Sequence, residues 1–121
     1  MSEIKLYLII NKDLHLTVGQ IAAQVSHITH LLVDLVVRMG YEEHPTPIHC
    51  INYMLWSKNP VTIIKKASTI ELNNLISHDN VLSFTDSVYQ KSSNTHIDSI
   101  TVIGFYPGSV STNEMDDYDL L

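Results

Sequence analysis

The sequence has little of what would place a protein in a class at once. It has one cysteine, Cys50, in 121 residues, which excludes an internal disulfide and fits a reducing compartment. No uninterrupted apolar run approaches the roughly 20 residues that cross a bilayer. The first residues do not form the cationic and apolar pattern of a signal peptide. We therefore expect a cytoplasmic protein with no membrane contact.

Metal-binding and nucleophile motifs are also absent from the sequence. His27 and His30 are one helical turn apart, but a zinc site needs three or four ligands, and the chain has neither HExxH nor a cysteine pair. The four glycines form no phosphate-binding loop, and no serine stands in a Gly-x-Ser-x-Gly setting. These absences predict no bound metal and no serine nucleophile.

Positive charge is scarce, with 7 Lys and Arg against 13 Asp and Glu, a net charge of −6. This balance argues against a generic nucleic-acid binder, which needs clustered cations. Four of the acids lie in the last eight residues, so residues 1–113 carry nine acids and seven bases, a net of −2. A local basic patch remains compatible with that balance, although ordinary solvated lysines explain it equally. Its candidates are Lys58, Lys65 and Lys66.

What the sequence does contain is an alternation of strand and helix patterns. The apolar run at residues 4–10 predicts a strand covered on both faces. Thr17 and Gln20 have capping-box spacing, so a helix should begin near Val18 and end at Gly40. Its inward stripe, at helical spacing, comprises Ile21, Val25, Ile28, Leu32, Leu35 and Met39.

The remaining elements complete an α/β pattern. Residues 48–56 fit a short helix or a strand, and the capping-box pair Ser68 and Glu71 predicts a helix over 69–77. Further strands are expected at 61–65, 81–85 and 99–106, with a polar loop at 86–97. This order predicts a three-layer α/β/α fold with a mixed, mainly parallel four-stranded sheet. One domain would span residues 1–108, followed by an acidic C-terminal tail at 109–121.

Several residues could carry chemistry, each with a plain structural alternative. His27 lies beside the apolar stripe of the first helix, where imidazole could act as a general base, although its spacing alone favours an ordinary, partly exposed histidine. Asp86 follows a strand, where ligand sites of α/β sheets gather, but it could equally cap a turn. Lys65 closes a strand and could meet a phosphate. Thr101, taken alone, is a good strand former.

These residues belong to a series of short motifs in a fixed order. The series runs through Asp13-Leu14, Gly19, Ala22-Ala23-Gln24, His27, Trp56 before the strand at 61–65, Val81 to Asp86, Thr101-Val102-Ile103-Gly104 and Pro107-Gly108. It resembles the type 2 peptidyl-tRNA hydrolase family, the archaeal and eukaryotic type, and covers residues 4–108.

The resemblance implies that the chain hydrolyses the ester between a peptide and the terminal ribose of tRNA, recycling peptidyl-tRNA without a cofactor. His27 and Asp86 would then position and activate water, and Thr101 would hold the substrate or the water. tRNA would be the partner, and a homodimer is plausible. The implied substrate-binding positions are Lys65, Lys66, Gln20, Gln24 and Thr95.

The chain departs from the family pattern in three places. Gln20 stands where the family has a lysine, and residues 87–90 replace a segment that contains an arginine. A longer loop follows, in which Thr95 is the candidate to replace the family's threonine. The acidic tail replaces the closing segment of the family. Because cations are lost and acids added, a binding or regulatory protein on the same fold is the alternative, and a hydrolase of another small ester or amide is a third option.

Overall fold

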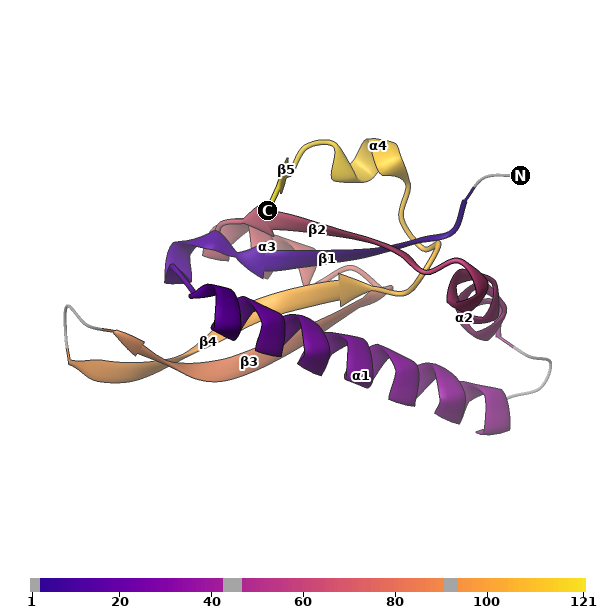
Figure 1. Ribbon diagram of the computed structural model, residues 1–121, viewed down its shortest axis with the longest axis horizontal. Helices are drawn as coiled ribbons and strands as arrows, with labels where there is room; N and C mark the ends of the chain where they lie inside the picture. Colours follow the sequence, from indigo (N-terminus) through magenta and orange to yellow (C-terminus); the bar gives the residue numbers. More distant parts are fainter. Residues whose placement is uncertain (1–2, 43–46, 91–93) are drawn as a thin grey trace.

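The computed structural model describes residues 3–42, 47–90 and 94–121 and builds them around a five-stranded sheet of order β3-β4-β1-β2-β5 (Figure 1). The strands are β1 (Lys5–Asn11), β2 (Val61–Ala67), β3 (Val81–Gln90), β4 (Thr95–Phe105) and β5 (Asp119–Leu120). The helices are the 3-10 helix η1 (Lys12–Leu14), α1 (Val18–Glu42), α2 (Ile48–Lys58), α3 (Thr69–Leu75) and α4 (Thr112–Met115).

The sheet is mixed, but the prediction that it is mainly parallel is wrong. Among the described residues β1 and β2 form the parallel pair, whereas β1–β4, β3–β4 and β2–β5 are antiparallel. The helices α1 and α2 separate β1 from β2, which gives the parallel crossover. No helix separates β3 from β4, so these two strands pair as a hairpin.

The polar loop predicted at 86–97 is also wrong, because both strands of the hairpin continue into it. The β3–β4 ladder extends from Val81↔Phe105 as far as Gln90↔Thr95. The pair Val88↔Ile97 supplies apolar contact within this outer stretch, whose other side chains are mostly polar. The hairpin therefore projects as a two-stranded ribbon beyond the end of the sheet where α1 begins (Figure 1).

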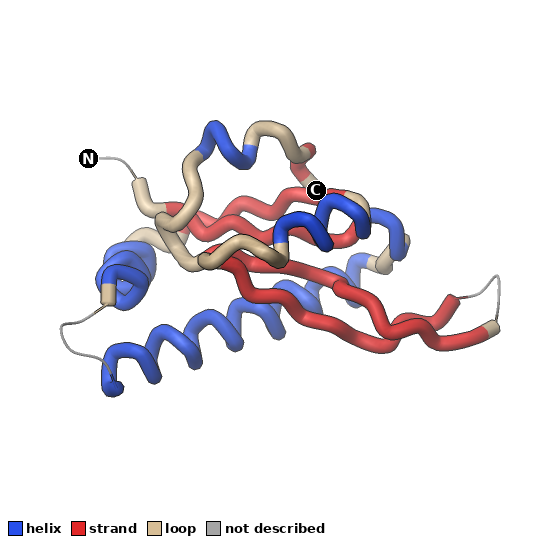
Figure 2. Tube along the Cα trace, turned by 180° about the vertical axis from the view of Figure 1, so that it is seen from behind, coloured by secondary structure: helices blue, strands red, loops and turns tan. Residues whose placement is uncertain are grey.

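Helices cover both faces of the sheet, as the alternating side chains of β1 show. Its even-numbered residues, Leu6, Leu8 and Ile10, pack with Ile28 and Leu32 of α1, and Trp56 of α2 lies against the same cluster. The odd-numbered Tyr7 and Ile9 pack with Leu72 of α3 and Met115 of α4. Figure 2 shows α3 lying across the face opposite α1. The prediction of a central strand covered on both faces is confirmed.

Helix α1 begins as predicted and ends later than predicted. The Thr17 amide donates to Gln20 Oε1 at 2.8 Å, and the Gln20 amide donates to Thr17 Oγ1 at 3.2 Å, which completes the capping box. The helix continues through Gly40 to Glu42, since a glycine inside a helix costs stability without preventing the helical conformation. In the buried stripe Val36 takes the place predicted for Leu35.

By length and composition, the stretch Val18–Gly40 of α1 could cross a membrane. The sequence prediction considered only uninterrupted apolar runs, and polar residues interrupt this stretch. The core helix of a soluble protein meets the same test. Here Ile28, Leu32 and Val36 are each no more than 3% exposed, and Ile28 and Leu32 pack on the sheet. Packing on the sheet thus accounts for one stripe of this helix, whereas Val18 and Val37 are exposed.

Of the other local predictions, some are confirmed and others are corrected by the structure. Residues 48–56 are helical, within α2, and Ser68 and Glu71 form the predicted capping box of α3, which ends at Leu75 rather than 77. The acidic tail expected at 109–121 contains two elements, α4 and β5, and β5 pairs with β2. Met115 is 2% exposed and Tyr118 packs in the same cluster, so these two side chains anchor an otherwise acidic segment.

Candidate active site

A β-bulge in β4 turns Thr101 toward α1. Phe84 pairs with Val102 and the next residue, Thr85, pairs with Ile100, so Thr101 is the extra residue in the ladder. Because of this extra residue Thr101 and Val102 both face α1, whereas Ile100 packs on the opposite side of the sheet. Thr101 is 0% exposed, so its hydroxyl needs a partner inside the protein.

That partner is the side chain of Gln24, which joins two strands to α1. Thr101 Oγ1 donates to Gln24 Oε1 at 2.7 Å, and Gln24 Nε2 donates to Asp86 Oδ2 at 3.1 Å. Thr101 Oγ1 also lies 3.2 Å from the carbonyl oxygen of Phe84. Gln24 is 6% exposed, and its two partners fix which end of the amide faces each of them. We call this arrangement of Asp86, Gln24 and Thr101 the Gln24 bridge.

Asp86 is the end of the Gln24 bridge nearest to solvent. It lies on β3 opposite Ser99 and is partly buried. Its second oxygen, Oδ1, accepts from the backbone amide of Ser87 at 2.8 Å. A carboxylate offers about four acceptor positions, so Asp86 retains capacity for a water molecule or a substrate hydroxyl.

His27 lies one helical turn after Gln24, at the exposed side of the same group. Its ring stacks on Phe84, with centroids 5.0 Å apart and an interplanar angle of 26°. Phe84 and Asp86 occupy alternate positions on the same face of β3, with Cα atoms about 7 Å apart. Within the described residues no hydrogen bond joins His27 to Asp86. The two side chains therefore lie on the α1 side of β3 without pairing directly.

The comparison with protein families decides the class of this chain. The family model of peptidyl-tRNA hydrolase PTH2 matches residues 4–115. The chain belongs to the PTH2 family. A comparison with individual curated proteins found no match. The family match extends seven residues past the domain boundary expected at 108 and so includes α4.

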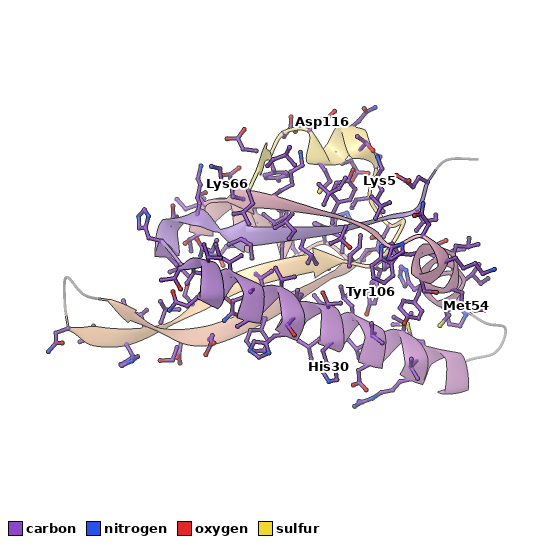
Figure 3. All side chains as sticks on the ribbon, viewed as in Figure 1. Lys5, His30, Met54, Lys66, Tyr106 and Asp116 are labelled. Carbon is purple, nitrogen blue, oxygen red and sulfur yellow. The ribbon has the colours of Figure 1, made fainter. Side chains whose placement is uncertain are left out.

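The two lysines implied by the PTH2 resemblance face opposite sides of the sheet. Lys65 pairs with Ile9 and faces α3, and its Nζ donates to the carbonyl oxygen of Tyr118 at 3.0 Å, so the structure does not bring it to the Gln24 bridge. Lys66 pairs with Ile10 and faces the side of α1. Figure 3 shows it near the end of β2, beside β5.

Two further positions implied by the PTH2 resemblance lie outside the Gln24 bridge. Gln20 is exposed one turn before Gln24, and its amide is engaged in capping α1. Thr95 opens β4 and is exposed, six residues before Thr101, which is about 20 Å along an extended strand. The structure therefore places Thr95 on the projecting hairpin, far from the bridge.

Sequence reasoning missed two features of this PTH2 site. Phe84 had no assigned role, although its position two residues before Asp86 on one strand could have placed it beside the same helix. Gln24 was expected to contact substrate, whereas the structure buries it between Asp86 and Thr101. Across the described ranges no group of three or more His, Cys, Asp and Glu side chains could hold a metal ion.

Proposed function

We propose that this chain hydrolyses the ester that links a peptide or an N-blocked amino acid to tRNA, thereby recycling peptidyl-tRNA. The observation that carries the proposal is the Gln24 bridge, which holds a carboxylate beside an exposed imidazole in a member of the PTH2 family. Neither group requires a metal or an organic cofactor to activate water. The reaction class is therefore cofactor-free ester hydrolysis.

In this reaction a water molecule attacks the ester carbonyl carbon, and the bond between that carbon and the ribose oxygen breaks. The attacking water gives a proton to His27 or Asp86, which both lie close to Phe84. The same residue then returns this proton to the ribose oxygen as the bond breaks. Both residues are the proposed catalytic groups because both retain access to solvent.

Thr101 has a different role in this proposal, because a fully buried hydroxyl does not reach the substrate. It acts as a positioning residue: Thr101 fixes the amide of Gln24, and Gln24 in turn holds the carboxylate of Asp86. Preorganised hydrogen bonds of this kind lower the cost of reorganising the site during reaction. Within the Gln24 bridge, Thr101 and Gln24 thus supply orientation, and Asp86 is the member that can accept a proton.

Substrate contacts are proposed on the α1 side of the sheet. Lys66 is the cation that faces this side, and the exposed Gln20 lies at the start of α1. Lys65 would require the tail to move, and Thr95 would contact only a distant part of the tRNA. We place this activity in the cytoplasm, where its tRNA substrate is found, and homodimer formation remains a prediction.

A second candidate is a catalytically weak binding or regulatory protein on the same fold. It is favoured by one observation: two of the three positions expected to supply a cation for tRNA binding lack a cation or have it engaged. Gln20 caps α1 where the family has a lysine, and Lys65 is hydrogen-bonded to the tail. Such a protein would bind a partner without accelerating ester hydrolysis.

The deciding experiment measures turnover of N-acetylated aminoacyl-tRNA by the wild-type protein and by His27→Ala and Asp86→Asn. His30→Ala is the matched control, because His30 is an exposed histidine on α1 that points away from the sheet (Figure 3). Activity that is lost in both site variants and kept in the control supports the hydrolase. No activity in the wild-type protein supports the second candidate. Equal activity in all four proteins contradicts the proposed site.

A further inference from the structure

The segment at residues 116–121 lies beyond the PTH2 family match and folds back along β2 (Figure 1). Two hydrogen bonds hold it there in addition to the β2–β5 pairing. The Leu121 amide donates to the carbonyl oxygen of Ile64 at 3.0 Å, and Lys65 Nζ donates to the carbonyl oxygen of Tyr118 at 3.0 Å. The segment begins directly after the buried Met115, so its position on the sheet is well defined.

The register of β5 brings acidic charge next to a lysine on the side of the proposed active site. Lys65 pairs with Leu120 and Lys66 pairs with Asp119. Residues opposite each other in an antiparallel pair share a face, so Asp119 lies beside Lys66 on the α1 side. Asp116 and Asp117 are exposed in the same segment, which therefore carries three acids and no base.

Lys66 is also in line with the Gln24 bridge across the sheet. Ile10 pairs with Lys66 on one side and with Val102, the neighbour of Thr101, on the other. Two strand spacings separate Lys66 from Val102, about 10 Å. A phosphate of a polynucleotide whose end lies at the bridge would therefore come within range of Lys66.

The ammonium group of Lys66 is available for a contact with a phosphate. In the part of the chain that the structure describes, the ion pair within 4.0 Å is Arg38–Asp34, not Lys66–Asp119. Asp119 thus lowers the positive potential around Lys66 without forming a close ion pair with it. At a solvent-exposed surface this effect weakens as salt screens the charges.

We propose that residues 116–121 are an intramolecular competitor of the RNA substrate for the lysines of β2. The segment occupies the side chain of Lys65 and places the carboxylate of Asp119 beside Lys66, where the phosphate backbone would bind. The inference rests on the proposed function for the identity of the RNA. Independently of that identity, the inference requires that neutralising the three acids strengthens the binding of a polyanion.

The test uses the full chain, with Asp119→Asn and the triple variant Asp116→Asn, Asp117→Asn, Asp119→Asn. Affinity for deacylated tRNA, and separately for heparin, is measured over a range of salt concentrations. The triple variant should bind about three- to tenfold more tightly at low salt, and its log-affinity should fall more steeply with log salt. Adding Lys66→Gln to the triple variant should remove most of the gain.

Asp79→Asn is the matched control for Asp119→Asn, because it removes one exposed carboxylate from the turn between α3 and β3. Unchanged affinity in the triple variant, or an equal gain in the Asp79 control, overturns the inference. Hydrolysis by the wild-type protein is assayed in parallel. Tighter tRNA binding by the triple variant, without hydrolysis in any protein, supports the inference and contradicts the proposed function. Hydrolysis with unchanged binding contradicts the inference and supports the proposed function.

Discussion

Two buried amide side chains near one end of the sheet differ in what they hold together. Asn11, 1% exposed, ends β1 on the face covered by α3. Its Nδ2 lies 2.8 Å from the carbonyl oxygen of Ile100 and 2.9 Å from Thr69 Oγ1, and its Oδ1 accepts from the Asp13 amide at 3.0 Å. Gln24, on the other face, contacts the side chains of Asp86 and Thr101.

Under the proposed function, the difference separates a structural amide from a functional one. Asn11 bonds the Asp13 amide at the turn into η1 and the Ile100 carbonyl oxygen on β4. Asp86 and Thr101 belong to strands whose ladder forms without Gln24. Burying the side chains of Gln24 and Thr101 to hold Asp86 adds desolvation cost and no element of the fold. Under the proposed function, Asn11 therefore serves stability and the Gln24 bridge serves activity.

The largest effect is expected at the exposed end of the bridge. Asp86→Asn should lower kcat/KM for peptidyl-tRNA by about 10²- to 10³-fold, the usual loss when an acid–base group is removed. The substituted amide keeps one oxygen for Gln24 Nε2 and loses the oxygen that accepts from the Ser87 amide, so the free energy of unfolding should fall by about 1 to 2 kcal/mol. Turnover and urea unfolding of the same preparation measure both quantities.

Asp98→Asn is the control for that substitution, because Asp98 is an exposed acid on β4, opposite Ser87 and so adjacent to Asp86 on the hairpin. It should leave turnover nearly unchanged. A comparable loss in both variants would show that the charge of the hairpin matters, not the carboxylate held by Gln24.

The converse result is expected for the structural amide. Asn11→Ala should lower the free energy of unfolding by about 2 to 3 kcal/mol, because it removes a cap and leaves the Ile100 carbonyl unpaired. Turnover per folded molecule should remain near that of the wild-type protein. Urea unfolding combined with turnover below the transition tests this. A loss of turnover as large as that of Asp86→Asn would break the distinction between the two amides.

Thr101 sharpens the distinction, because it is buried yet assigned to the bridge. Thr101→Val keeps the shape but leaves Gln24 Oε1 without its 2.7 Å donor, so stability should fall by about 1 to 2 kcal/mol. We expect kcat to fall about tenfold with KM little changed, as for a group that positions a catalytic residue. Thr101→Ser should restore kcat. A valine variant with normal kcat would make Thr101 purely structural.

The local elements of this fold could be predicted from sequence because their signals are local. The capping boxes at Thr17–Gln20 and Ser68–Glu71 fixed where two helices begin, and the apolar content of residues 4–10 predicted the central strand. Strand direction depends instead on which strands pair. The polar composition of residues 86–97 therefore predicted a loop, although cross-strand pairing makes this stretch part of a hairpin.

The candidate site was predictable as a set of residues and not as an arrangement. Family resemblance selected Gln24, His27, Asp86 and Thr101, but the bulge that aims Thr101 at Gln24 depends on a one-residue shift in the β3–β4 register. A one-residue difference also decides that Lys65 and Lys66 face opposite sides of the sheet. The face that each of these residues occupies can be assigned only when the neighbouring strands and their register are known.

The smallest expected effect concerns Tyr118, which lies on the same face of the sheet as Asn11. Burial raises the pKa of its phenol above the usual 10.0, and the negative charges of Glu71 and Asp117 raise it further. The folded protein thus favours the neutral phenol. The contribution to stability is constant below the unfolded pKa and is lost as pH rises from about 10 through the higher folded pKa.

Tyr118→Phe should therefore flatten the alkaline decline of the unfolding free energy and leave turnover at neutral pH unchanged. Thermal or urea unfolding between neutral pH and pH values above the phenol pKa measures the difference between the two proteins. The two proteins are compared at each pH, so that every other titrating group contributes equally to both. An alkaline decline as steep in the phenylalanine variant as in the wild-type protein would show that the phenol of Tyr118 is not the cause of the loss.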